Sequence, residues 1–187
     1  MAMNMVIGFI IGLVAVAIVG YIVSIFNGLI RLKNNIEKSW ANINVLLKQR
    51  HDELPKLIST VKGYMKHEKN VLESLTQART SILKTNDIHK KAGLNNQISD
   101  ALKTIFAVSE NYPKLMASAN FQQLQQRISG IENEIADRRE FYNDSVNAFN
   151  IRIQSIPDVL VAKMMGYSKK EMFRVQPTDL QDVKVEF

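Results

Sequence analysis

Residues 5–26 contain no charged side chain, and this run constrains the chain more than any other feature. An α-helix rises about 1.5 Å per residue, so these residues make a helix of about 33 Å, enough to cross a hydrocarbon core of about 30 Å. A cleaved signal peptide needs a basic segment before its apolar run and a small-residue cleavage site after it. Residues 1–4 contain no Lys or Arg, and the triplet Ala15-Val16-Ala17 lies inside the run. The sequence therefore predicts a retained transmembrane helix.

The basic residues beside the run set its predicted orientation. Arg31, Lys33 and Lys38 follow it closely, and no basic side chain precedes it. By the positive-inside rule, the N-terminus is predicted outside and the remainder of the chain in the cytoplasm, with the inverted arrangement as the alternative. We expect the same three side chains to contact lipid headgroups, because cytoplasmic leaflets carry anionic lipids.

Small residues recur within the run. Gly8 and Gly12 form a GxxxG pattern, and Ala15 and Gly20 extend it. Small side chains let two helix backbones approach closely in lipid, so this pattern predicts self-association of the transmembrane helix. The alternative is that these glycines have no special role, since glycine is frequent in membrane helices.

The charge of the rest of the chain is uneven. Residues 27–92 carry 13 basic and 6 acidic side chains, whereas residues 93–187 carry 11 and 12. The basic half is thus the one next to the predicted membrane helix, which favours contact with anionic lipid. The chain contains no cysteine, which excludes disulfides, thiolate metal sites and a cysteine nucleophile.

Apolar residues recur at helical spacing over most of the remaining chain, and glycine and proline are sparse. The predicted fold is all-α, with the N-terminal transmembrane helix running into an elongated antiparallel bundle of three to four long helices. The predicted parts are an anchor (1–28), the bundle (29–156), and a short helix with a polar tail (157–187). Apolar and polar residues alternate at 183–187. This segment is too short to carry a sheet and equally fits an extended tail available for docking on a neighbour.

Three breaks divide the predicted bundle into four helices. Pro55 is expected to kink or turn the first helix, and residues 54–82 then follow coiled-coil spacing with two charged positions, Glu68 and Arg79. A loop is expected at 85–95, the third helix is expected to stop at Pro113, and the fourth to run from a cap at Asn120 to residue 156. One stripe at helical spacing runs along the fourth helix and is expected to face the core: Phe121, Leu124, Ile128, Ile131, Ile135, Arg138, Tyr142, Val146, Phe149, Ile153 and Ile156.

Several segments resemble motifs of the LemA family. They are Ser-Trp-Ala-Asn-Ile-Asn-Val-Leu-Leu-Lys-Gln-Arg-His-Asp-Glu-Leu-Pro at 39–55, Val-Lys-Gly-Tyr-Met-Lys-His-Glu at 61–68, Asn-Phe-Gln-Gln-Leu-Gln at 120–125, Arg-Glu-Phe-Tyr-Asn at 139–143, Phe-Asn-Ile-Arg-Ile at 149–153, Gly-Tyr at 166–167 and the closing Val-x-Phe. They span the chain in order. The resemblance implies a single-pass protein of the bacterial inner membrane with an elongated helical domain, and it implies no reaction.

Catalytic and cofactor-binding patterns are missing from the sequence. The three histidines, His51, His67 and His89, lack HExxH or other metal-ligand spacing, and no glycine-rich phosphate loop or GxSxG elbow occurs. The basic residues are dispersed without interleaved aromatic residues, which argues against nucleic-acid binding. We therefore expect no enzyme activity, no cofactor and no nucleic-acid partner.

Polar and aromatic residues of the family-like motifs are candidate site residues. One interpretation is a buried polar layer that fixes helix register; the other is an exposed contact with a second copy or another protein, because Arg and Tyr often anchor interfaces. The set is Trp40, Arg50, His51, Arg138, Arg139, Tyr142 and Asn143.

The predicted function is a structural protein that self-associates into a scaffold or coat at the membrane and shapes it. The alternative is an anchored adaptor or signalling accessory that presents a helical surface to an unidentified protein. The expected partners are membrane lipids and further copies of the same chain.

Overall fold

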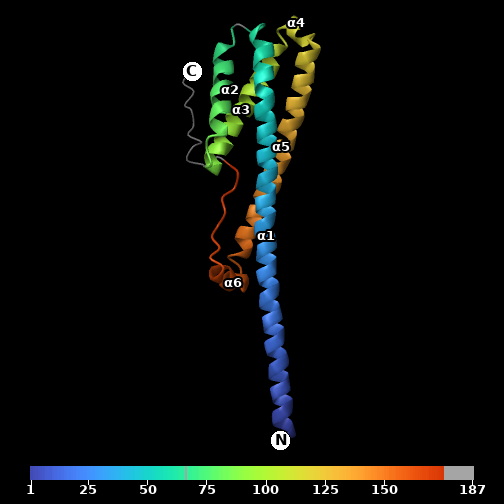
Figure 1. The fold of residues 1–187 in the computed structure, drawn as a ribbon, viewed down its shortest axis with the longest axis vertical. Helices are drawn as coiled ribbons and strands as arrows, with labels where there is room; N and C mark the ends of the chain where they lie inside the picture. Colours follow the sequence, from blue (N-terminus) through green and yellow to red (C-terminus); the bar gives the residue numbers. More distant parts are fainter. Residues whose placement is uncertain (66, 175–187) are drawn as a thin grey trace, which may run out of the picture. The chain divides into compact units, whose positions relative to one another are not determined.

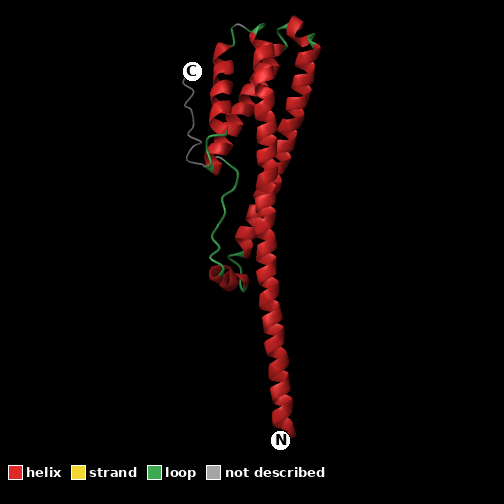
Figure 2. Cartoon of the chain, in the orientation of Figure 1, coloured by secondary structure: helices red, strands yellow, loops and turns green. Residues whose placement is uncertain are grey.

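A computed structural model describes residues 1–65 and 67–174 of the chain. In this part of the chain the regular structure is entirely α-helical, without a strand, which confirms the predicted all-α class (Figure 2). The helices are α1 (Ala2–Lys62), α2 (Lys69–Ile82), α3 (Ile88–Ser109), α4 (Pro113–Met116), α5 (Ala119–Arg152) and α6 (Asp158–Met164). The alternating residues 183–187 lie outside the described part.

Helix α1 is a single unbroken helix, so the apolar run continues directly into the first polar segment, as predicted (Figure 1). Its first 24 residues are exposed on every side, and burial begins at Ile25 and Leu29. The sequence supplies helix-forming residues throughout, and Gly28 is the only glycine between residues 21 and 62.

Pro55 does not end the helix, and the predicted turn there is wrong. A proline inside a helix has no N–H to donate to the carbonyl four residues earlier, which here belongs to His51. The Nε atom of Arg79, on α2, donates a hydrogen bond to that carbonyl oxygen at 3.1 Å. The missing backbone donor is thus replaced by a side chain, and α1 continues to Lys62. This bond also explains why a charged residue occupies an apolar position of the heptad.

The segment 54–82 is not one helix, contrary to the sequence prediction. It is divided between the end of α1 and α2, with residues 63–65 and 67–68 outside both helices. The apolar residues of the expected heptad are nevertheless largely buried on both sides of the break, among them Val61, Met65 and Leu72. Burial therefore followed the pattern, while helix continuity did not.

Two predicted boundaries also moved. The third helix begins at Ile88 rather than after residue 95, because Asp87 caps it by accepting a hydrogen bond from the Lys90 N–H at 2.9 Å. Gly93 is consequently an interior residue of α3. The fourth long helix begins at Ala119 rather than after Asn120, and the Ser118 hydroxyl accepts a hydrogen bond from the Phe121 N–H.

The described chain after Ser109 contains one unexpected helix and two expected helices. The short helix α4 starts at Pro113, which confirms that α3 stops before it, but α4 itself was not predicted. Helix α5 ends at Arg152, four residues earlier than expected. Helix α6 was predicted as a short apolar element stopped by Gly166, and Gly166 adopts a positive φ of 66° just beyond it.

The chain divides into two compact units, each with its own core. Unit 1 contains Met1–Ser39 and Asp144–Lys170; unit 2 contains Trp40–Asn143 and residues 171–174 of the described part. Unit 1 buries Ile25, Leu29, Val146, Phe149 and Ala162, and unit 2 buries Leu54, Leu75, Ile98, Ile105, Phe121 and Ile128. Within unit 2, α2 and α3 pack side by side (Figure 1). The elongated antiparallel bundle and the boundaries at residues 28 and 156 stay predictions.

Candidate functional sites: the exposed apolar helix and two side-chain clusters

The N-terminal part of α1 is long and apolar enough to cross a membrane, and within the part of the chain that the structure describes no other helix is. Its apolar side chains, such as Phe9, Ile11 and Val16, are exposed around the whole helix. A helix that is apolar on all faces and covered by no protein is suited to a lipid environment, since water would make this exposure costly.

Three of the predicted self-association residues share one face of this helix. At about 100° per residue, Gly8, Gly12 and Ala15 fall within about 60° of one another, whereas Gly20 lies about 120° away from Gly8. No atom lies within 4 Å of a Cβ built on Gly8, Gly12 or Gly20, so the backbone at these positions is open to a neighbouring helix. The geometry thus permits close helix packing at Gly8, Gly12 and Ala15.

The three predicted headgroup contacts lie on α1 beyond the apolar run. Arg31 and Lys38 are exposed, and Lys33 is half-buried with its Nζ 3.6 Å from a carboxylate oxygen of Glu37. Exposed cations directly after a membrane segment are placed to reach anionic headgroups.

Arg50 is the centre of a buried polar cluster in unit 2. Its side chain is 1% exposed. Its Nη1 atom donates to Glu132 at 2.5 Å, its Nη2 atom donates to Asn95 at 2.7 Å, and Ser99 donates to the second oxygen of Glu132. The cluster joins α1, α3 and α5 through side-chain hydrogen bonds, and Arg50 is buried in it rather than exposed; a role of this layer in fixing helix register stays a prediction.

The electrostatics of the cluster follow from its burial. Burial lowers the pKa of Arg50 and of Arg139, and for Arg139 the nearby charge of Arg50 acts in the same direction. Arg139 is half-buried and donates to Asn96 at 3.0 Å. A polar cavity of about 440 Å³ lies beside the cluster and is lined by Asn95, Asn96, Ser99, Asp100, Lys103, Glu132, Asn133 and Arg139, among others. The cavity gives Glu132, whose side chain is 22% exposed, access to solvent.

A second cluster in unit 2 surrounds Phe173, which is fully buried. The Trp40 ring lies 5.5 Å from the Phe173 ring and 5.4 Å from the Tyr142 ring, between ring centroids. The guanidinium of Arg139 lies 5.0 Å from the centre of the Phe173 ring, and the ammonium of Lys91 lies 5.3 Å from that of Trp40. These aromatic and cation–π contacts form what we call the Phe173 cluster.

Hydrogen bonds hold the backbone around Phe173 to this cluster. Asn143 accepts a bond from the Phe173 N–H at 2.7 Å, and the Tyr142 hydroxyl donates to the Glu171 carbonyl at 3.0 Å. The His89 ring lies 2.8 Å from the Arg174 carbonyl oxygen. Burial, together with the charge of Glu171, raises the pKa of Tyr142 from 10 to about 12, so its hydroxyl stays protonated and able to donate further into the alkaline range. Residues 171–174 are therefore docked by side chains of α3 and α5.

The other two candidate residues lie outside both clusters. His51 is half-buried, with its ring 3.3 Å from Asp52, and it takes part in the fold through its backbone carbonyl. Arg138, which was predicted in the apolar stripe of α5, is exposed, so its neighbour Arg139 takes the inward position.

Sequence reasoning missed the partners of these residues. Glu132, Asn95 and Phe173 are central to the two clusters, yet each looked like an ordinary surface or tail residue. A signal existed for Asn95 and Ser99, because they lie four residues apart on the same helix face as Ile98 and Leu102. No comparable pattern marks Glu132 or Phe173, because their partners are distant in sequence.

The described residues contain no group of three or more His, Asp or Glu side chains that could hold a metal ion. Several of their acidic side chains pair with cations instead, for example Glu53 with Arg127 at 3.0 Å and with Lys56 at 3.2 Å. Although burial acts to raise the pKa of Glu53, hydrogen bonds from Arg127 and Lys56 bring it below its ordinary value.

Comparisons with known proteins agree with the resemblance in the sequence. The family model described as "LemA family" matches residues 39–187. Magnetosome proteins MamQ 1 and MamQ 2 of Paramagnetospirillum magneticum are each 20% identical over 188 residues, which cover 87% of this chain and 69% of each relative. Magnetosome protein MamQ of Magnetospirillum gryphiswaldense is 26% identical over 85 residues, covering 46% of this chain and 31% of the relative.

Proposed function

This chain belongs to the LemA family, and from that premise we propose that it is a non-enzymatic helical protein, anchored in the bacterial inner membrane, that self-associates into a structural scaffold. The observation that carries this proposal is the exposed apolar part of α1 with its open Gly8–Gly12–Ala15 face. Such a face supplies a contact between copies that needs no further domain.

Two further features support the proposal. The apolar run and the first polar segment are one helix, so a contact between copies in the membrane also brings their α1 helices together beyond it. Anchoring in a bilayer raises the effective concentration of neighbouring copies, so weak contacts suffice for assembly. The relatives are named as magnetosome proteins, and these names state no reaction.

The proposed orientation has the N-terminus outside and the helical domain in the cytoplasm. Arg31, Lys33 and Lys38 support it through the positive-inside rule. Labelling of single-cysteine variants in intact cells with a membrane-impermeant maleimide tests it. Labelling of a cysteine at Gln97 from outside would reverse the orientation.

The experiment that tests self-association is electron microscopy and sizing of the full-length protein extracted gently with its lipids. Large regular particles containing only this chain are expected. The variant Gly8→Leu/Gly12→Leu should reduce them to small species, because the added side chains separate the helix backbones. The matched control is Ala17→Leu, which adds bulk about 180° from Gly8. Unchanged particle size in the double glycine variant would refute the proposal as stated.

An adaptor role is the second candidate, and one observation favours it. An open groove of about 570 Å³ lies in unit 2, where the end of α1 meets α2. It combines apolar residues with charged ones and is lined by Ile58, Lys62, Met65, Lys69, Leu72, Glu73, Thr76 and Gln77. A groove of this kind suits an amphipathic segment of another protein. Monomers or dimers in the sizing experiment would support this role.

A further inference from the structure

Unit 1 carries an exposed apolar patch outside the transmembrane run. It lies on residues 151–170, which we call the α6 corner. Three large apolar side chains are strongly exposed there: Ile156 at 88%, Leu160 at 64% and Met164 at 87%. Ile151 is exposed as well. An exposed cluster of this kind marks a surface that meets an apolar partner.

The patch is held in a fixed orientation. The opposite side of α6 is packed into unit 1 through Val161 and Ala162, both buried. Beyond α6, the ring of Tyr167 lies 5.5 Å from that of Phe149, which is itself buried. Because the inward face is fixed by packing, Leu160 and Met164, one helical turn apart, must point outward together.

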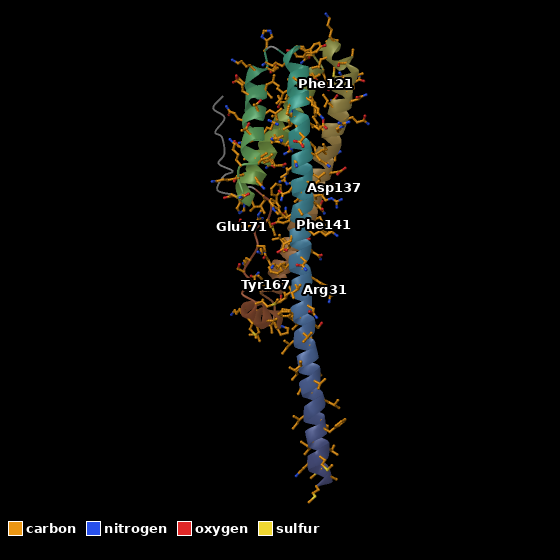
Figure 3. All side chains as sticks on the ribbon, in the orientation of Figure 1. Arg31, Phe121, Asp137, Phe141, Tyr167 and Glu171 are labelled. Carbon is orange, nitrogen blue, oxygen red and sulfur yellow. The ribbon has the colours of Figure 1, made fainter. Side chains whose placement is uncertain are left out.

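The α6 corner lies beside α1 at the end of the apolar run. A Cβ built on Gly28 would approach the Nη2 atom of Arg152 to 2.8 Å, so the last residue of α5 touches the α1 backbone two residues beyond Phe26. Arg152 is in turn fixed by Asp158, the first residue of α6, at 2.7 Å. Figure 3 shows Tyr167 and Arg31 at a similar level along α1.

The charge of the α6 corner complements an anionic surface. Its charged residues are Arg152, Lys163, Lys169 and Lys170 against a single carboxylate, that of Asp158. The three lysines are exposed, and the carboxylate is occupied by Arg152. Apolar side chains combined with flexible cations are the composition of elements that lie in a membrane interface.

From these four observations we propose that the α6 corner is a second membrane contact, which inserts Ile156, Leu160 and Met164 into the headgroup and acyl boundary of an anionic bilayer. The contact presupposes the membrane anchoring of α1 proposed above. It would hold unit 1 against the surface at two points, so that the protein presses on the leaflet beside its own transmembrane helix. Asymmetric insertion of this kind displaces lipid in one leaflet.

The depth of the α6 corner tests the proposal in the full-length protein. Because the chain contains no cysteine, Met164→Cys creates a single site for an environment-sensitive fluorophore. The labelled protein is reconstituted in vesicles of phosphatidylcholine and phosphatidylglycerol, with and without lipid that carries a nitroxide near the headgroup end of its acyl chain. We expect a blue-shifted emission and several-fold stronger quenching than for Gln97→Cys, an exposed site on α3. Emission and quenching equal to those of Gln97→Cys would overturn the proposal.

Two further samples separate the causes of a negative result. Ile18→Cys, inside the apolar run, must be protected from water in every preparation, which shows that the protein is inserted. Adding Leu160→Glu to Met164→Cys should reduce quenching at residue 164 and leave Ile18→Cys unchanged; undiminished quenching would overturn the role of this face. Particle size reports self-association independently, so an immersed α6 corner without assemblies would refute only the scaffold.

Discussion

Replacement of Arg50 by methionine should destabilise the protein by about 3 kcal/mol, because it leaves one member of a buried ion pair without its partner. The value lies at the lower end of the usual range since Glu132, at 22% exposure, can be solvated through the adjoining cavity and keeps the hydrogen bond from Ser99. Part of the Arg50 stem volume is also retained by methionine.

Removal of the other member of the ion pair should cost more stability. Glu132→Leu leaves the Arg50 guanidinium at 1% exposure with only Asn95 and Ser99 as partners, and arginine does not release its proton in proteins. We expect a loss of about 4 to 5 kcal/mol. The double variant removes both charges and leaves mainly the Asn95 oxygen without a donor, at about 1 to 2 kcal/mol. It should therefore be more stable than either single variant.

Trp40 is the only tryptophan and lies in the same unit, so its fluorescence during urea unfolding in detergent micelles measures these differences. The urea concentration at the midpoint of unfolding should shift, while the slope of the unfolding free energy against urea concentration stays the same. Arg138→Met is the matched control, because this exposed arginine should change stability by less than about 0.5 kcal/mol. If the losses of the two single variants simply add in the double variant, Arg50 and Glu132 are not energetically coupled and the reasoning fails.

Three other predictions test the contacts that replace expected features. Arg79→Met should destabilise unit 2 by about 1 kcal/mol in urea unfolding, because the His51 carbonyl loses its donor. Adding Pro55→Ala should recover the lost stability, because alanine at position 55 supplies a backbone N–H to that carbonyl. A double variant no more stable than Arg79→Met would contradict this account. Phe173→Ala should cost about 3 kcal/mol and expose residues 171–174 to proteases, with Trp40 emission shifting to the red; unchanged emission would show that the ring does not pack there. Since the pKa of Tyr142 is raised from 10 to about 12, its contribution to stability is complete below pH 10 and is lost as the pH rises towards 12, so the alkaline decline in urea stability should be shallower in Tyr142→Phe.

The placement of side chains inside or outside was predictable wherever a long periodic pattern existed. Ile128, Ile135, Val146 and Phe149 are all buried, as the stripe along the fourth helix predicts. The same stripe placed Arg138 inward and Ile156 in the core, and both are exposed. The pattern failed at Ile156 because α5 ends at Arg152, and it failed at Arg138 because a heptad specifies a face of a helix, not where along that helix a neighbour covers it.

Helix boundaries were less predictable than burial. Pro55 carries a strong local preference to end a helix. The donor that it lacks is supplied by the Arg79 side chain, which bonds to the His51 carbonyl 28 positions away in the sequence. Residues 63–65, directly after α1, show the opposite case, in which good apolar spacing did not keep the chain helical. At Pro55 a tertiary contact outweighed the local propensity, whereas Gly63, directly after the last residue of α1, is a local signal that lowers helix propensity despite the apolar spacing.

The sequence by itself determined the long apolar helix, the all-α class and the family, because these depend on composition and periodicity along one continuous stretch. Only the tertiary structure decided which polar residues meet. The partners Arg50 and Glu132 lie 82 positions apart in the sequence, and the rings of Phe173 and Trp40 are in contact although these residues are also distant in the sequence. Such pairs leave no local pattern, since a buried charge or a docked ring is defined by the groups that surround it in space.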